Sequence, residues 1–111
     1  MIITNLNHLP PQTVSHNPEI TKKVMLSMGD LPHLTNFSQA IFVPGQVAIA
    51  HAHQDMSEVF LVNAGKGIIR IEGTPYDLTP GVCVAVQPGE THEVINSGTN
   101  NLVLTYFGIQ N

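Results

Sequence analysis

Basic residues are scarce in this chain. Of its 111 residues only four are Lys or Arg, against eight Asp or Glu, which gives a formal charge of −4. The four are Lys22, Lys23, Lys66 and Arg70, and only the first two are neighbours. Nucleic-acid binding needs a cluster of cations that displaces counterions from phosphates, and binding to an anionic membrane surface needs a similar basic face. The sequence therefore predicts neither a nucleic-acid nor a membrane partner.

Cysteine and long apolar runs are equally rare. Cys83 is the single cysteine, so the chain forms no internal disulfide, which favours a reducing cytoplasm. No stretch approaches the roughly 18 apolar residues of a transmembrane helix, and the first residues lack the basic region and apolar run of a signal peptide. We expect a cytoplasmic protein in which Cys83 is a small buried hydrophobe on a strand.

Helical periodicity is also missing. Short β-branched and apolar runs are broken by Gly, Pro and Asn at intervals of about 8–12 residues, which is typical of a sandwich or barrel. Residues 1–20 contain three prolines and are predicted to form an irregular N-terminal arm before a single domain at 21–111. The expected strands are 22–28, 38–43, 46–53, 58–63, 67–72, 82–87, 92–96 and 101–108, with a weaker one at 76–79.

Three histidines and one glutamate lie at suggestive positions on these strands. His51 and His53 are two residues apart, so in a strand they face the same side with backbones about 7 Å apart. After a four-residue turn, Glu58 opens the next strand, and His92 opens a later one after the turn 88–91. Each feature alone is weak, because a histidine pair is often incidental and Glu58 alone suits a solvated strand end.

The spacing of the whole set is more specific. Gly45, His51, His53, Glu58 and Gly65 form one motif (45–65), and a second (81–96) contains Gly81, Gln87, Gly89, His92 and Asn96. Across 38–108 the chain resembles the cupin superfamily, whose two motifs have this spacing. The resemblance implies an all-β jelly-roll barrel (a double-stranded β-helix) of six to nine strands.

That resemblance also assigns roles to the four residues. In the family the first motif supplies two histidines and a glutamate and the second supplies one histidine, all binding a metal inside the barrel. These roles fall on His51, His53, Glu58 and His92. The family's second motif has proline where this chain has Gln87, but Pro88 follows and the later spacing is kept, so we expect an intact turn.

The ligand types constrain the metal. Three imidazoles and one carboxylate suit one divalent transition ion such as Fe, Mn, Ni, Cu or Zn, and are too nitrogen-rich for Mg or Ca. An ion that prefers six ligands would keep two positions for water or substrate. Its identity does not follow from the ligands.

Strand alternation predicts what surrounds the metal. Residues in phase with the ligands should form the pocket wall, unless they simply fill a solid barrel. These residues are Val47, Ile49, Phe60, Val62 and Val94. Strand 67–72 has an ambiguous phase, so Arg70 could face either the pocket or solvent.

Two classes of function fit this pattern. The first is a metal-dependent enzyme, of oxygenase (dioxygenase), isomerase or lyase type, acting on a small metal-chelating molecule. The second is a non-catalytic module that binds or senses a metal or small ligand. The scarcity of cations near the pocket favours a neutral ligand or a weak anion over a sugar phosphate, because a buried phosphate needs strong donors.

The strand residues that alternate with the predicted inward-facing ones are apolar too. Since the chain has little charge to cover its exterior, such residues indicate either a homodimer interface or packing against a second sheet. We expect a homodimer. The residues concerned are Ala48, Ala50, Ala52, Val59, Leu61 and Ile95.

Overall fold

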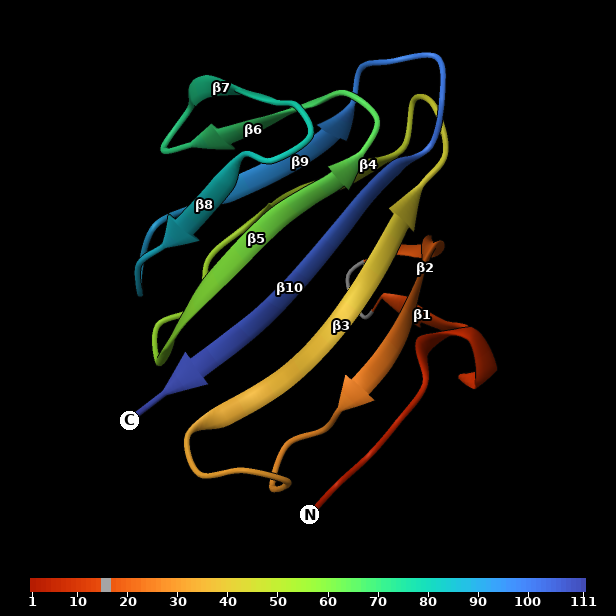
Figure 1. Cartoon of the computed structure of the whole chain (residues 1–111). Helices are drawn as coiled ribbons and strands as arrows, with labels where there is room; N and C mark the ends of the chain where they lie inside the picture. The colour runs from red at the N-terminus through yellow and green to blue at the C-terminus, as the bar shows by residue number, and fades with distance from the viewer. Residues whose placement is uncertain (15–16) are drawn as a thin grey trace.

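The computed structural model describes residues 1–14 and 17–111. In this part of the chain a short 3-10 turn at Leu6–His8 precedes ten strands in two antiparallel sheets (Figure 1). The expected all-β architecture is therefore confirmed. Among the same residues there is no helix long and apolar enough to cross a membrane.

The larger sheet contains six strands, and β10 lies near its middle, between β3 and β5 (Figure 1). Its order is β1 (Gln12–Val14), β2 (Asn17–Leu26), β3 (Leu34–Phe42), β10 (Leu102–Gln110), β5 (Met56–Ala64) and β8 (Cys83–Val86). The smaller sheet has the order β4 (Val47–His51), β9 (His92–Asn96), β6 (Gly67–Ile71) and β7 (Thr74–Leu78). From β3 onward the chain passes repeatedly between the two sheets, which winds them around a common interior.

The core lies between the inner faces of the sheets. Alternation along β5, β9 and β10 turns every second side chain inward, as the burial patterns of these strands show. The buried hydrophobic cluster includes Ile20, Phe42, Phe60, Val62, Ile69, Leu78, Val94, Leu102 and Leu104. Asn96 is buried as well, and its side-chain amide donates to the carbonyl oxygens of Phe42 and Asn100, both at 2.9 Å. Its amide therefore fixes the end of β9 against β3 without leaving a buried donor unpaired.

The predicted N-terminal arm is wrong over part of its length. Residues 12–14 form β1, and β2 begins at Asn17 rather than at residue 22; residues 15 and 16 of the arm lie outside the described residues. Prolines suggested an irregular segment, but Pro18 falls where the β1–β2 register is shifted and before the β2–β3 ladder starts at Thr21. A missing N–H is tolerated at such a position. Ile20 of β2 is fully buried, so this strand belongs to the barrel.

Cys83 also departs from expectation, because it is exposed rather than buried. On β8 the inward phase belongs to Val84 and Val86, of which Val86 is buried. Cys83 and Ala85 have the opposite phase and face outward. The strand was predicted correctly, but its phase could not be read from four small residues in a row.

Candidate metal centre

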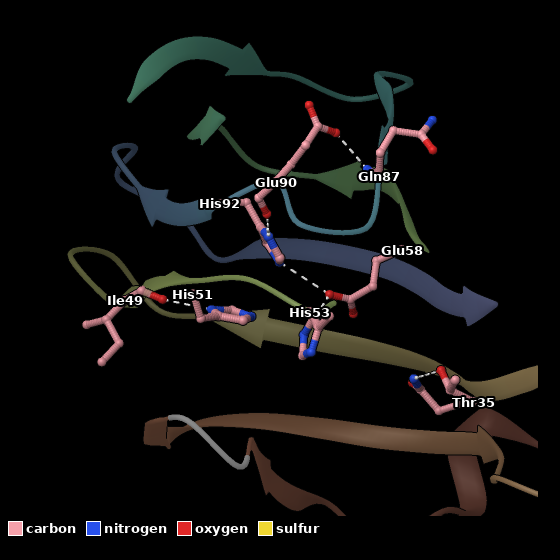
Figure 2. Close-up of polar contacts among 9 residues, drawn as sticks. Thr35, Ile49, His51, His53, Glu58, Gln87, Glu90 and His92 are labelled. Atoms are coloured by element: carbon pink, nitrogen blue, oxygen red, sulfur yellow. Dashed lines mark hydrogen bonds and ion pairs between the residues drawn. The ribbon is translucent and has the colours of Figure 1, made fainter. Parts of the chain in front are cut away.

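The four predicted ligands come together at one point inside the barrel. His51 is the last residue of β4, His53 follows in the β4–β5 connection, Glu58 is on β5 and His92 is the first residue of β9. One ligand atom from each lies within 4.8 Å of all the others. Figure 2 shows the side chains converging from these separate segments. The predicted set is therefore placed as a metal site requires.

An irregularity in β4 brings two of the histidines together. Ala48 pairs with Val94, but the next pair is His51 with His92, so β4 takes three steps where β9 takes two. The extra residue is a register shift of the β-bulge type, which re-aims the side chains that follow it. As a result the rings of His51 and His92 lie side by side, with centroids 4.3 Å apart.

Hydrogen bonds to main-chain carbonyls orient two of the imidazoles. The Nδ1 atom of His51 lies 2.8 Å from the carbonyl oxygen of Ile49, and Nδ1 of His92 lies 3.2 Å from that of Glu90 (Figure 2). A carbonyl only accepts, so each Nδ1 carries a proton and donates it. In the neutral ring Nε2 then carries the lone pair, which is the state in which histidine binds metals.

Glu58 is the charged member of the cluster. Its Oε1 atom lies 3.2 Å from Nε2 of His53 and 3.2 Å from Nε2 of His92. Glu58 and His92 are 7% and 2% exposed, so both groups are largely removed from water. A buried carboxylate requires a cation or donors close by, and only these imidazoles face it at ion-pair distance among the described residues.

The environment of His92 indicates which cation fits. Its Nε2 atom is buried and lies 3.2 Å from Oε1 of Glu58, with no other polar partner in the described part of the chain. A lone pair aimed at a carboxylate oxygen is unfavourable unless a proton or a metal ion lies between them. Burial lowers the pKa of His92, but the hydrogen bonds and charges of Glu58 and Glu90 outweigh it and raise the pKa above 6.5. The donor set of three imidazole nitrogens and one carboxylate therefore fits a divalent transition metal.

A cavity of about 170 Å³ adjoins the four ligands. It is smaller than the roughly 300–1,000 Å³ of typical drug-sized sites, so it suits a small molecule. Most of the wall is apolar, formed by Ala40, Phe42, Ala48, Phe60, Val94 and Leu104. Its polar members besides the ligands are Lys22, Asn36 and Tyr106.

Of the five residues predicted for the pocket wall, two line the cavity and three lie elsewhere. Phe60 and Val94 line the cavity. Ile49 is 59% exposed and Val47 is half-buried off the cavity, because the extra residue in β4 turns Ala48 inward instead. Val62 does face inward but is packed within the hydrophobic cluster away from the cavity.

Tyr106 and Lys22 are cavity residues that were not predicted. The Tyr106 ring stacks on Phe60 with centroids 5.6 Å apart. Burial raises the pKa of Tyr106 to about 12, with the Glu58 charge acting in the same direction and Ser38 opposing it. Its hydroxyl therefore stays protonated at physiological pH. The alternation Leu102, Leu104, Tyr106 in the last strand is the signal that could have placed it.

The orientation of Arg70 and the effect of Gln87 are both settled by contacts. Arg70 is on the outer face of β6, where its Nη1 atom lies 2.8 Å from Oε1 of Glu93 and its side chain is 42% exposed. Ile69, which pairs with Val94, takes the inward phase.

The turn that begins at Gln87 is closed by two hydrogen bonds (Figure 2). The Glu90 N–H donates to the Gln87 carbonyl oxygen at 3.2 Å, and Glu90 Oε1 accepts from the Gln87 N–H at 2.7 Å. The turn before His92 is thus intact without the motif proline.

Comparison with known proteins agrees with this geometry. A predicted oxalate decarboxylase from Thermotoga maritima superposes with a TM-score of 0.88 at 19% identity, covering 99% of this chain and 100% of that one. KdgF from a Halomonas species gives 0.79 at 22% identity (100% and 94% covered), and a cupin-superfamily sugar phosphate isomerase from Silicibacter pomeroyi gives 0.82 at 15% (98% and 76%). At such identities the likeness establishes the fold, the double-stranded β-helix. No curated protein sequence matches the chain.

The family model for the cupin domain matches residues 39–108, a span that contains all four site residues. More than half of the chain lies within the match. The chain belongs to the cupin family.

Proposed function

We propose that this chain is a metal-dependent enzyme acting on a small molecule that chelates one divalent transition ion. The observation that carries the proposal is the convergence of His51, His53, Glu58 and His92 on one point at the wall of a cavity. A purely structural ion would need no adjoining space. Four protein ligands leave two positions free on a six-coordinate ion, and the cavity gives a ligand access to them.

The metal ion and the protein side chains would contribute different parts of the chemistry. When bound, the metal would supply Lewis-acid polarisation of a chelating carbonyl, enol or carboxylate, or, if iron, a binding position for dioxygen. The three imidazoles and Glu58 would hold it. Phe60, Val94 and the other apolar wall residues exclude water from the bound molecule, and the protonated hydroxyl of Tyr106 offers a hydrogen-bond donor beside Glu58.

The type of reaction is a more specific part of the proposed function. One structurally similar protein is described as a predicted oxalate decarboxylase and another as a sugar phosphate isomerase. These descriptions support retaining lyase and isomerase chemistry beside dioxygenase chemistry as candidates. Arg70 points away from the cavity and pairs with Glu93, so the described residues that line the cavity do not include the cluster of cations that a phosphate dianion requires.

Metal content is the first test. Purified protein should be stripped, reloaded anaerobically with Fe, Mn, Ni, Cu or Zn, and analysed for elements. We expect about one ion per chain, lost in His51→Ala and His92→Ala because a site with two imidazoles and one carboxylate binds far more weakly. His8→Ala, which removes an exposed histidine outside the cluster, is the matched control and should keep the ion. Absence of stoichiometric uptake of every one of these ions by the wild type would contradict the proposal.

A second measurement separates catalysis from binding. Metal-loaded protein should be offered a panel of enols, diketones, catechols and 2-oxo acids, with dioxygen uptake, ligand-induced thermal shift and recovered product followed together. Turnover that disappears in His92→Ala supports the enzyme. A ligand that raises the melting temperature and is always recovered unchanged would favour the alternative, a non-catalytic binding or sensing module.

A further inference from the structure

Lys22 is the one Lys or Arg among the described residues that line the metal-site cavity. Among the described residues that line it, the charged side chains are Lys22 and Glu58, together with the three histidines of the site. The other three cations of the chain are outside it. Lys23 donates to the Leu6 carbonyl at 3.3 Å, Lys66 is exposed in a turn, and Arg70 pairs with Glu93.

The sheet register places Lys22 on the inner face. It pairs with Ala40 of β3, which in turn pairs with Leu104 of β10, and both of these partners are buried. Ile20, two residues earlier on β2, is fully buried with the same phase. Ala40 is small, so the row leaves room for the long lysine side chain beside the cavity.

Lys22 is not used to neutralise an acidic residue. No carboxylate of the described residues lies within ion-pair distance of its ammonium group. With a divalent ion on the four ligands, Glu58 compensates only part of the positive charge, so the cavity is net positive. A mostly apolar cavity with excess positive charge favours an anionic occupant, because a buried charge needs a partner of opposite sign.

We propose that Lys22 binds a carboxylate group of the substrate while the other end of that molecule chelates the metal. This inference rests on the proposed function and narrows it to small carboxylic acids. One lysine matches the single charge of a carboxylate, whereas a phosphate dianion would need further cations that the cavity does not contain.

Lys22 also borders a second cavity, of about 200 Å³, on the outer side of β2 next to Lys23 and Leu6. If the Lys22 ammonium group interacted only with this second cavity, replacing Lys22 would not change the affinity of ligands that bind at the metal. Lys23 is therefore the matched control, since it neighbours Lys22 in sequence and has the opposite phase on the strand.

The test uses chelating probes with and without a terminal charge. Hydroxamates bind metals through two oxygens, so the monohydroxamates of malonic, succinic and glutaric acid carry a carboxylate at increasing distances from the chelating end. Their terminal carboxamides are neutral and nearly the same size. Affinities are measured by titration calorimetry on nickel- or zinc-loaded full-length protein, with acetohydroxamate as the probe that reports on the metal alone.

We expect one of the acids to bind wild type about tenfold or more tightly than its carboxamide, the gain typical of a charge-assisted hydrogen bond. In Lys22→Met the preference should fall to within about twofold, Lys22→Arg should keep most of it, and Lys23→Met should keep all of it. Acetohydroxamate affinity and metal content should be unchanged in these variants.

Several outcomes would overturn the inference. Equal wild-type affinity for acid and carboxamide at every length would do so without any variant. A preference that survives Lys22→Met, or stronger competition by a sugar phosphate than by any acid, would do so as well. Failure of acetohydroxamate to bind fully metal-loaded wild type would instead contradict the proposed function, so the two failures are distinguishable.

Discussion

At the scale of single residues, His92 shows how burial, hydrogen bonding and charge combine. Glu58 and Glu90 hold its pKa above 6.5 despite the opposing effect of burial. In the metal-free protein the folded state therefore binds this proton more tightly than the unfolded state does. That contribution to the free energy of unfolding is fully present below about pH 6.5 and is lost as the pH rises through the folded pKa. A metal ion has the reverse requirement, because it needs the neutral ring.

We predict that metal occupancy falls as the pH drops from 7 to 5, since protons compete for the ligand imidazoles. Equilibrium dialysis against buffered metal measures this directly. As the pH falls through the folded pKa of His92 towards about 6.5, the metal-free protein should gain stability relative to a His92→Gln variant, and below about 6.5 the difference should level off. In that window metal occupancy and metal-free stability therefore change with pH in opposite directions. Metal retention that is flat between pH 7 and 5 at equilibrium would show that histidines are not the ligands.

At the scale of the strands, residue spacing and residue phase were not equally predictable. The spacing of the two motifs, together with the family resemblance, predicted the four residues that converge at one point, because turns and short strands fix how far apart such residues lie along the chain. The phase of β4 could not be predicted, since a single extra residue between Ala48 and His51 reverses it and leaves no mark in the local sequence. That one residue moved Ile49 out of the pocket and Ala48 into it.

The N-terminal segment shows a second limit. Its prolines indicated irregular structure, while β1 exists through pairing with β2, and β2 through pairing with β3, the next strand along the chain. Local propensity carries no information about such a partner. Lys22 was therefore not predicted to reach the pocket, and Arg70 was the cation considered for it.

A motif glycine gives a prediction at this scale. Gly65 and Gly45 have nearly equal positive φ angles, 87° and 86°. A Cβ on Gly65 would meet main-chain atoms, the Asn101 carbonyl oxygen and Leu102 Cα at 2.8 Å, whereas a Cβ on Gly45 would meet nothing within 4 Å. Both alanine variants suffer the cost of a positive φ, roughly 1 kcal/mol, but only Gly65→Ala must also displace backbone.

We therefore expect Gly65→Ala to lose about 2 kcal/mol more than Gly45→Ala in the free energy of unfolding, in the range of overpacking costs. Urea denaturation followed by circular dichroism gives both values from matched variants. Equal losses would mean that the chain around Asn101 yields freely and that the close approach is unimportant. A Gly65→Ala protein that does not fold at all would agree with the expectation.

At the scale of the whole molecule, the outer face of the six-stranded sheet carries a band of apolar residues. Across β3, β10, β5 and β8 the register aligns Phe37, Phe107, Val59 and Ala85, and the next row adds Leu61 opposite Cys83. Leu61 is 41% exposed, and β8 pairs only with β5 among the described strands, so it presents a free edge. Of the residues expected to face outward, Ala48 lines the cavity instead, while Val59 and Leu61 belong to this band.

We predict that the chain forms a homodimer through this band. Its burial against a second copy would remove apolar surface from water, which the few surface charges cannot otherwise cover. Light scattering after size exclusion should give the dimer mass at micromolar concentration, and Leu61→Glu should shift the population towards monomer while metal content is kept. Ile49→Glu is the matched control, because it places the same charge on an exposed apolar residue of the other sheet.

Cys83 provides an independent check on the geometry. It is the only cysteine and is exposed within the band, so in a symmetric dimer built on this face two copies of it lie on the same interface. A short bismaleimide should then link wild-type chains into a covalent dimer at low protein concentration, and Leu61→Glu should abolish the link. A monomer at high micromolar concentration would refute the dimer. A dimer that resists Leu61→Glu and dissociates with Ile49→Glu would place the interface on the four-stranded sheet instead.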